Sequence, residues 1–181
     1  EQIVSWAETT MLLDDGLWSA SQAAAPEYYA LEDHERSMHD PPGIDHAIYA
    51  NVNPQWLGAL AEAGGRLERI DWVARAEQGL RQLLVRMEAP GGLIYHYQLP
   101  GAEPQLGSIL LDVTEVARAC IAVGQASGDP EFIAVARKLV GAIEKHFWAD
   151  DGGFYDRIKG PDDVGVLRYR DRPFDLNAEL A

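Results

Sequence analysis

The sequence predicts an all-α fold made of antiparallel helical hairpins, and three observations lead to this prediction. Apolar residues recur at three- and four-residue steps over four long segments, which is typical of amphipathic helices. The corners within each pair of segments are short and contain Gly, and one of them adds Asp and Pro. A loop in which Gly precedes aromatic residues follows a helix at three places. Helices joined by short corners pack antiparallel, and stacked hairpins of this kind form α/α toroids.

The clearest hairpin lies between residues 106 and 147. Gly128 ends its first helix, Asp129 is a good N-cap for the second, and Pro130 suits the first helical position, where a missing N–H costs no hydrogen bond. The apolar stripe of the first helix contains Leu106, Ile109, Val113, Val116, Ala117, Cys120 and Val123. The stripe of the second contains Phe132, Val135, Ala136, Leu139, Ile143 and Phe147.

An earlier hairpin follows the same pattern. Asn53 and Pro54 begin a helix that ends at Gly64 and Gly65, and a longer helix then runs from Ile70 to Met87. Each long hairpin is followed by a Gly-aromatic loop, GGLIYHY at 91–97 or GGFYDR at 152–157, and a third such loop, DGLWSAS, lies at 15–21. We expect short β-like ribbons in these loops and a weak internal repeat. Gly followed by aromatic residues is also a common turn-to-strand pattern, so the repeat has a simpler alternative.

Composition excludes several classes of function. The 181 residues carry a formal net charge of −14, which repels nucleic-acid phosphates and anionic lipid, so we expect neither nucleic acid nor membrane as a partner. No apolar stretch is long enough to span a bilayer. The single cysteine, Cys120, excludes an intrachain disulfide and fits a reducing compartment, so we predict a cytoplasmic location.

No cofactor is predicted, because nothing in the sequence resembles a phosphate loop, a dinucleotide fingerprint or a nucleophile elbow. The acidic and histidine residues of 32–40 lack a recognised zinc spacing with a third ligand nearby, so no metal is predicted either.

The chain is expected to form one helical domain over residues 1–181, as a segment of a larger toroid. A helical pattern starts directly at Glu1, and the segment RPFDLNAELA at 172–181 begins another helix. An isolated helical face must be covered. We therefore expect the partner to be the remainder of a parent toroid or a second copy in a homo-oligomer.

Four segments together resemble the DUF255, thioredoxin-domain-containing family, of the YyaL and spermatogenesis-associated protein 20 type. They are DGLWSASQAAAPEYYAL, PPGIDHAIYANVNPQWLGALAEAG, LLDVTEVARACIAVGQASGDPEFI and FWADDGGFYD. The resemblance implies a helical region similar in fold to six-hairpin glycosidases and N-acylglucosamine 2-epimerases. It covers nearly the whole chain but only an internal portion of the family's toroid, and the family's thioredoxin-like domain with its redox cysteines is absent here.

Two departures from the family pattern concern residues that could bind a ligand. Ala23, Ala24 and Ala25 stand where the family usually has an acidic Asp-Ala-Asp run. The family's Trp-Asn pair corresponds to the stretch Asn51-Val52-Asn53-Pro54, which keeps asparagine but not the aromatic residue. If the family binds a sugar or carries out chemistry here, the two departures favour a loss of that function in this chain. Asn51 and Asn53 remain the residues predicted to contact a substrate at this place.

Two carboxylates are the predicted catalytic residues. A glycosidase needs two carboxyl groups across the scissile bond, whereas the epimerases of this fold class use histidines as acid and base. Asp112 lies near a helix start, and the resemblance places it facing the toroid axis; Asp45 follows Pro-Pro-Gly. Each has a structural alternative, a first-turn acid for Asp112 and an Asx turn for Asp45. Glu115 lies on a more polar side and is expected on the surface.

The predicted ligand is a carbohydrate, because sugars stack on aromatic rings that offer apolar faces and polar edges. Anchoring of the loops to the core is the alternative role for these rings. The predicted contacts in the Gly-aromatic loops are Trp18, Tyr95, His96, Tyr97 and Tyr155. Three functions remain open at this point. The chain could belong to a carbohydrate-active hydrolase or epimerase, it could be a noncatalytic binding or structural module, or it could be an excised segment without activity of its own.

Overall fold

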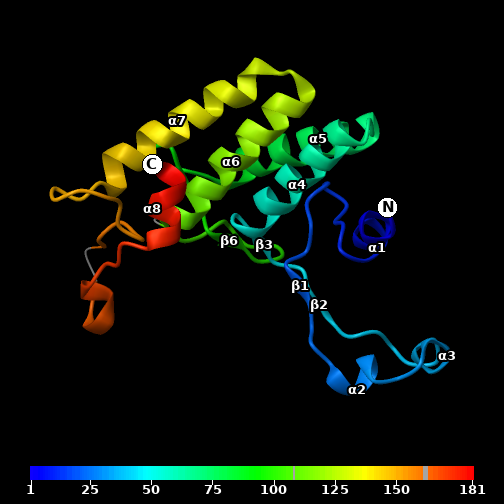
Figure 1. The fold of residues 1–181 in the computed structure, drawn as a ribbon. Coiled ribbons are helices and arrows are strands. Elements are labelled where there is room, and N and C mark those ends of the chain that lie inside the picture. Colours follow the sequence, from blue (N-terminus) through cyan, green and yellow to red (C-terminus); the bar gives the residue numbers. More distant parts are fainter. Residues whose placement is uncertain (108, 161–162) are drawn as a thin grey trace.

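The structure, a computed structural model, describes residues 1–107, 109–160 and 163–181 and has the predicted helical architecture (Figure 1). Two long antiparallel hairpins pair α4 (Val52–Arg66) with α5 (Ile70–Met87) and α6 (Leu110–Ser127) with α7 (Pro130–Phe147). The shorter helices are α1 (Gln2–Thr10), α2 (Pro26–Tyr29), α3 (Asp33–Arg36), the 3-10 helix η1 (Gly165–Arg168) and α8 (Phe174–Leu180).

Helix α6 is the centre of the molecule. It packs against α4, α5 and α7, and the short helix α8 also contacts it (Figure 1). Helices α4, α6 and α8 therefore form one layer, which α5 and α7 cover on one face. The N-terminus and the C-terminus lie at opposite sides of this layer (Figure 1).

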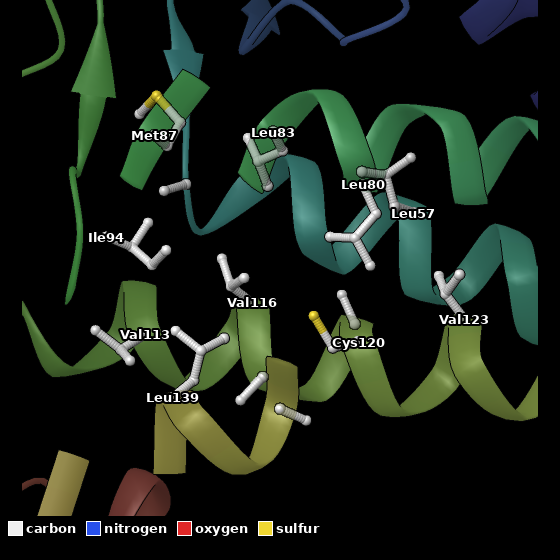
Figure 2. Close-up of a cluster of buried hydrophobic side chains, with 14 of the residues drawn as sticks. Leu57, Leu80, Leu83, Met87, Ile94, Val113, Val116, Cys120, Val123 and Leu139 are labelled. Carbon is white, nitrogen blue, oxygen red and sulfur yellow. The ribbon is translucent and has the colours of Figure 1, made fainter. Parts of the chain in front are cut away.

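The core fills the space between the two layers. Figure 2 shows side chains from both hairpins and from the loop after α5 meeting there; the labelled ones are Leu57, Leu80, Leu83, Met87, Ile94, Val113, Val116, Cys120, Val123 and Leu139. Full burial of one such side chain contributes roughly 1.5–3 kcal/mol to stability. Burial also raises the pKa of the Cys120 thiol to about 12, so this cysteine is a packed hydrophobe and not a reactive thiolate.

The helix boundaries confirm the capping signals at Gly128 and Asp129, but the predicted end of the earlier helix at Gly64 and Gly65 is wrong, because α4 continues through both to Arg66 and the left-handed residue is Glu68, at φ 57°. Gly128 is left-handed at φ 76°, and the Asp129 side chain accepts a hydrogen bond of 2.9 Å from the Glu131 N–H. Leu106, which was predicted in the stripe of the next hairpin's first helix, lies outside that helix. Leu106 has a φ of 64°, is 51% exposed and precedes the first residue of α6 by four positions. The three- and four-residue pattern thus continued by coincidence into a loop whose backbone cannot be helical.

The three Gly-aromatic loops form the predicted ribbons, all with one register. In the loop after α5, β4 (Glu88–Ala89) pairs with β5 (Leu93–Ile94), and the bridges Leu12–Trp18 and Trp148–Phe154 occupy the same place in the other two loops. In each loop a carbonyl at the helix end accepts a hydrogen bond from the N–H eight residues later: Met11 from Ser19, Met87 from Tyr95, and Phe147 from Tyr155. The weak sequence repeat therefore corresponds to one structural unit used three times.

Further ribbons connect the loops to one another. Strand β3 (Ile48–Tyr49), which directly precedes α4, pairs antiparallel with β6 (Tyr97–Gln98) in the loop between α5 and α6. Strand β1 (Ser21–Gln22) pairs with β2 (Ile44–Asp45), and α2 and α3 extend from this ribbon away from the helical layers (Figure 1). The β3–β6 ribbon matters for function because it brings the start of α4 to the loop that precedes α6.

Within the described residues, no helix combines the length and apolarity that crossing a bilayer requires.

Candidate functional site

A buried carboxylate and a histidine meet at the start of α6. Asp112 lies in the first turn of α6 and is 0% exposed, and His96 lies in the preceding loop between β5 and β6. The Nδ1 atom of His96 is 2.9 Å and 3.0 Å from the two carboxylate oxygens of Asp112. Because the ring is held by both oxygens, its orientation is determined by a residue that belongs to the rigid helix.

The pair has the electrostatic properties of an acid–base group. Burial raises the pKa of Asp112 from 3.8 to about 6, and the hydrogen bond and charge of His96 lower it in part. An ionised Asp112 favours the His96 tautomer with its proton on Nδ1, which leaves the lone pair of Nε2 available to accept a proton. The carboxylate also stabilises the imidazolium that results from protonation.

His96 opens into a shallow depression at the loop end of the molecule. This depression has a volume of about 400 Å³ and is lined by Ala20, Ser21, Asp45, Tyr49, Asn51, Val52 and His96. The structure thus brings three predicted site residues, Asp45, Asn51 and His96, to one place. They come from β2, the residue before α4 and the loop before α6, and the β1–β2 and β3–β6 ribbons hold these segments together.

Asp45 makes the predicted Asx turn and also lines the depression. Its Oδ1 accepts a hydrogen bond of 3.0 Å from the Ala47 N–H, which is the predicted Asx turn, and the residue is exposed at the edge of the depression. Asp112, in contrast, does not line the depression. The structure therefore assigns Asp112 to holding His96, and its predicted direct contact with a substrate would require the loop to move.

An aromatic cluster surrounds His96. The ring centroids of Tyr49 and His96 are 5.5 Å apart, those of His96 and Tyr97 5.9 Å, and those of Tyr49 and Tyr97 6.1 Å. The Tyr97 hydroxyl donates a hydrogen bond of 3.0 Å to Gln105. Tyr97 was a predicted ligand contact, whereas Tyr49 was not among the predicted contacts. Its role depends on the β3–β6 pairing, which no local sequence signal predicts.

Two predicted ligand contacts are used by the protein itself. Asn53 is 0% exposed, and its side chain accepts a hydrogen bond of 2.8 Å from the Trp18 N–H and donates one of 2.9 Å to the Trp18 carbonyl. Trp18 is 4% exposed and packs on Trp56. These two hydrogen bonds hold the first Gly-aromatic loop against α4, and we call such a pair of bonds from one asparagine a clasp. In this structure the side chains of Asn53 and Trp18 cannot reach a ligand.

The third Gly-aromatic loop is held by an equivalent clasp. Asn177 of α8 accepts a hydrogen bond of 2.6 Å from the Phe154 N–H and donates one of 3.0 Å to the Phe154 carbonyl. In the middle loop Ile94 occupies the place of Trp18 and Phe154 and is packed in the core near Val113 (Figure 2). In this loop the hydrogen bond between His96 and Asp112 of α6 links the loop to the helix, in place of the asparagine that binds the backbone of the other two loops. The candidate site therefore lies at the one of the three loops that lacks this asparagine.

The remaining predicted contacts, Tyr95 and Tyr155, do not line the depression. Tyr95 is half-buried and packs against the core. The ring of Tyr155 is covered by the guanidinium of Arg170, whose central carbon lies 3.6 Å from the ring centroid. Both rings therefore anchor their loops in this structure, which was the alternative role for the loop aromatics.

Glu115 was predicted to lie on the surface, and this prediction is wrong. The residue is 6% exposed, because α4 and α6 approach each other closely beside it. The approach is possible because Gly58 of α4 faces the backbone of Ala119, and a Cβ built on Gly58 would lie 3.6 Å from the Ala119 Cα. The periodicity of α6 alone could not show that its polar side has a neighbour.

No group of three or more potential metal ligands occurs within the part of the chain that the structure describes.

Comparisons with known proteins identify the fold. No family model and no curated protein matches the chain. Among solved structures, a sugar epimerase from a ruminal bacterium has a TM-score of 0.66 at 15% identity, covering 86% of this chain and 36% of that protein. An unsaturated glucuronyl hydrolase from Bacillus sp. GL1 has a TM-score of 0.65 at 15% identity, covering 96% and 47%. The family 8 endoglucanase Cel10 from Klebsiella pneumoniae has a TM-score of 0.59 at 11% identity, covering 90% and 46%.

The likeness shows that the chain has the fold of the six-hairpin glycosidase-like α/α toroids, as predicted. The chain spans between about a third and a half of the length of these three structures. It is therefore similar to a segment of a toroid of that kind.

Proposed function

We propose that the chain carries the acid–base site of a carbohydrate-active α/α toroid, in which His96 exchanges a proton with a bound sugar. The observation that carries this proposal is the His96 ring, which is held by the buried Asp112 on one side and lines an open depression on the other. A positioned imidazole of this kind is the most common general acid or base in enzymes. The similarity in fold to a sugar epimerase, a glucuronyl hydrolase and an endoglucanase makes a carbohydrate the ligand class to test.

The geometry favours proton transfer by histidine over hydrolysis by two carboxylates. Hydrolysis requires two carboxyl groups that both reach the glycosidic bond. Asp45 is the carboxylate in the lining of the depression, and Asp112 is enclosed behind His96. Abstraction and return of a proton at the carbon next to the carbonyl of an open-chain sugar, as in an epimerase, places the electron pair on the carbonyl oxygen and requires an acid and a base that contact the sugar. A histidine can serve as either.

Recognition of the ligand would use the other residues of the depression. Tyr49 offers a ring face or edge beside His96, and the carboxylate oxygens of Asp45 can accept hydrogen bonds from sugar hydroxyls. The helices that complete the toroid around this site would come from the rest of a parent protein or from a second copy of the chain. The chain spans about half or less of the related structures, which supports this part of the proposal.

The test is hydrogen–deuterium exchange at the carbon atoms of sugars, followed by NMR in deuterated buffer. The protein is used at the length that its organism produces, with glucose, mannose and N-acetylglucosamine as probes. We expect exchange at one carbon position of at least one sugar, and we expect His96→Gln to reduce the rate by about 10²–10⁴-fold, the usual contribution of a general acid–base group. His39→Gln is the control, because His39 is exposed in the loop after α3, outside the depression.

Two results would contradict the proposal in different ways. Binding of a sugar in the depression without any exchange would indicate a noncatalytic binding module. Exchange that is unaffected by His96→Gln would show that another group performs the chemistry. Binding is followed separately by the shifts of the His96 ring resonances upon addition of each sugar.

A further inference from the structure

A second hollow lies between α4 and α6, apart from the His96 depression. It has a volume of about 420 Å³ and is lined by Pro54, Gln55, Gly58, Ala59, Glu62, Glu115, Arg118, Ala119 and Ala122. This volume lies within the range of about 300–1,000 Å³ that is usual for small-molecule sites. Because all of its lining residues belong to α4 and α6, we call this hollow the α4–α6 groove.

The floor and the walls of the α4–α6 groove differ in chemistry. Its floor is formed by small residues, since Gly58 lies close enough that a Cβ there would be 3.7 Å from the Ala122 Cβ. Its walls are polar and comprise Gln55 and Glu62 on α4 and Glu115 and Arg118 on α6. A floor of small residues with hydrogen-bond donors and acceptors along both walls suits a flat ligand that carries many hydroxyl groups. It suits the apolar face of a partner's helix less well.

Glu115 is an unusual member of this wall, because a charged residue is rarely buried to this extent and its partner is exposed. Its side chain is 7% exposed, yet its ion-pair partner Arg118 is 57% exposed, and the two atoms are 3.3 Å apart. Arg118 also binds Glu179 of α8 at 3.2 Å, so it is shared between two carboxylates. Burial raises the pKa of Glu115, which shows that the pair does not fully compensate for its desolvation.

The α4–α6 groove and the His96 depression lie on one continuous side of α4. Val52 lines the depression, and Gln55, Ala59 and Glu62 line the groove. These positions follow steps of three and four residues, so they share one face of the helix. Similarly, Asn51 before the start of α4 lines the depression, and Pro54, three residues later, lines the groove. A ligand that leaves the depression along α4 therefore enters the groove within one helical turn.

We propose that the α4–α6 groove binds further units of the carbohydrate chain whose terminal unit occupies the depression beside His96, with Glu115 and Gln55 contacting its hydroxyl groups. This inference rests on the proposed function and specifies its substrate class as an oligosaccharide without acidic groups. Anionic sugars are disfavoured because Arg118, the cation in the groove lining, is already paired with Glu115 and Glu179, whereas Glu62 and Asp45 lie nearby.

The experiment compares binding of glucose, cellotriose, maltotriose and glucuronate by calorimetry, again with the protein at its natural length. We expect one of the trisaccharides to bind at least about tenfold more tightly than glucose, which corresponds to about 1.4 kcal/mol. We expect Ala59→Trp to remove this advantage, because position 59 is exposed and an indole there fills the groove without altering the core. Glu115→Gln should weaken trisaccharide binding and leave glucose binding unchanged.

The matched control is Ala134→Trp, which places the same bulk at an exposed alanine of α7 outside the groove. Equal affinity for glucose and for both trisaccharides would overturn the inference while leaving the proposed function intact. A trisaccharide advantage that survives Ala59→Trp would also overturn it, since the additional units would then bind elsewhere. Absence of binding by every neutral sugar would overturn the inference and the proposed function together.

Discussion

Replacement of Asn53 by alanine tests whether the Gly-aromatic loops are held by buried clasps. The Asn53 side chain makes two hydrogen bonds to the Trp18 backbone, at 2.8 Å and 2.9 Å. Asn53 is completely buried and Trp18 is nearly so. Alanine would leave the Trp18 N–H and carbonyl without partners in a place that water does not reach. The effect is therefore a loss of stability and not of ligand binding.

The magnitude follows from the two groups left unpaired. Each buried polar group that loses its partner costs about 1–3 kcal/mol, so the two together cost about 2–6 kcal/mol. Alanine has a higher helix propensity than asparagine, which returns up to about 0.7 kcal/mol inside α4. We expect Asn53→Ala to lower the free energy of unfolding by about 2–5 kcal/mol.

The assay is urea denaturation followed by far-UV circular dichroism, with Asn177→Ala as the internal comparison. Asn177 makes the equivalent clasp on Phe154, but its surroundings are only part-buried, so water can replace some of the lost bonds. We expect its effect to be about half that of Asn53→Ala. A loss below about 0.5 kcal/mol for Asn53→Ala, or a larger loss for Asn177→Ala, would refute this reasoning.

Three further predictions concern stability. Because the pKa of Asp112 is about 6 in the folded protein and 3.8 in the unfolded chain, the folded state binds more protons between these values, and the free energy of unfolding should fall as the pH rises from about 4 to 6. The total fall is on the order of 3 kcal/mol, and urea denaturation at several pH values should show that Asp112→Asn removes it. Gly79→Ala should destabilise by about 1–3 kcal/mol in thermal unfolding, because its Cβ would lie 2.6 Å from Leu57 Cδ2. Gly141→Ala in α7, where nothing lies within 4 Å, should instead stabilise by about 0.5–1 kcal/mol.

The helices could be predicted from the sequence because their signals are local. The apolar stripes, the Gly128 stop and the Asp129 cap all depend on residues within about one turn of each other, and the structure confirms each of them. The error at Leu106 has the same origin. A stripe carries no information about where the backbone leaves the helix, and the positive φ of Leu106 is set by its loop.

The candidate site could be predicted only in part. Asp112, Asp45, His96 and Asn51 were identified from residue type, position and family resemblance, but the sequence could not show that Asp112 is hydrogen-bonded to His96. These two residues are joined by the return of the chain into α6, and the depression in front of them is assembled by the β1–β2 and β3–β6 ribbons. Trp18 and Asn53 looked like ligand contacts because polar and aromatic loop residues are ambiguous until their burial is known.

The all-α class, the two long hairpins and the repeated loops could be predicted from the sequence alone, because helix periodicity and capping are interactions between residues close along the chain. The tertiary structure alone decided which polar side chains are enclosed. Glu115 is buried because α4 approaches at Gly58, Asn53 because Trp18 folds back onto it, and Asp112 because the His96 loop covers it. Burial depends on segments far apart in sequence, and burial decides which of these polar side chains must find a hydrogen-bond or ion-pair partner within the protein.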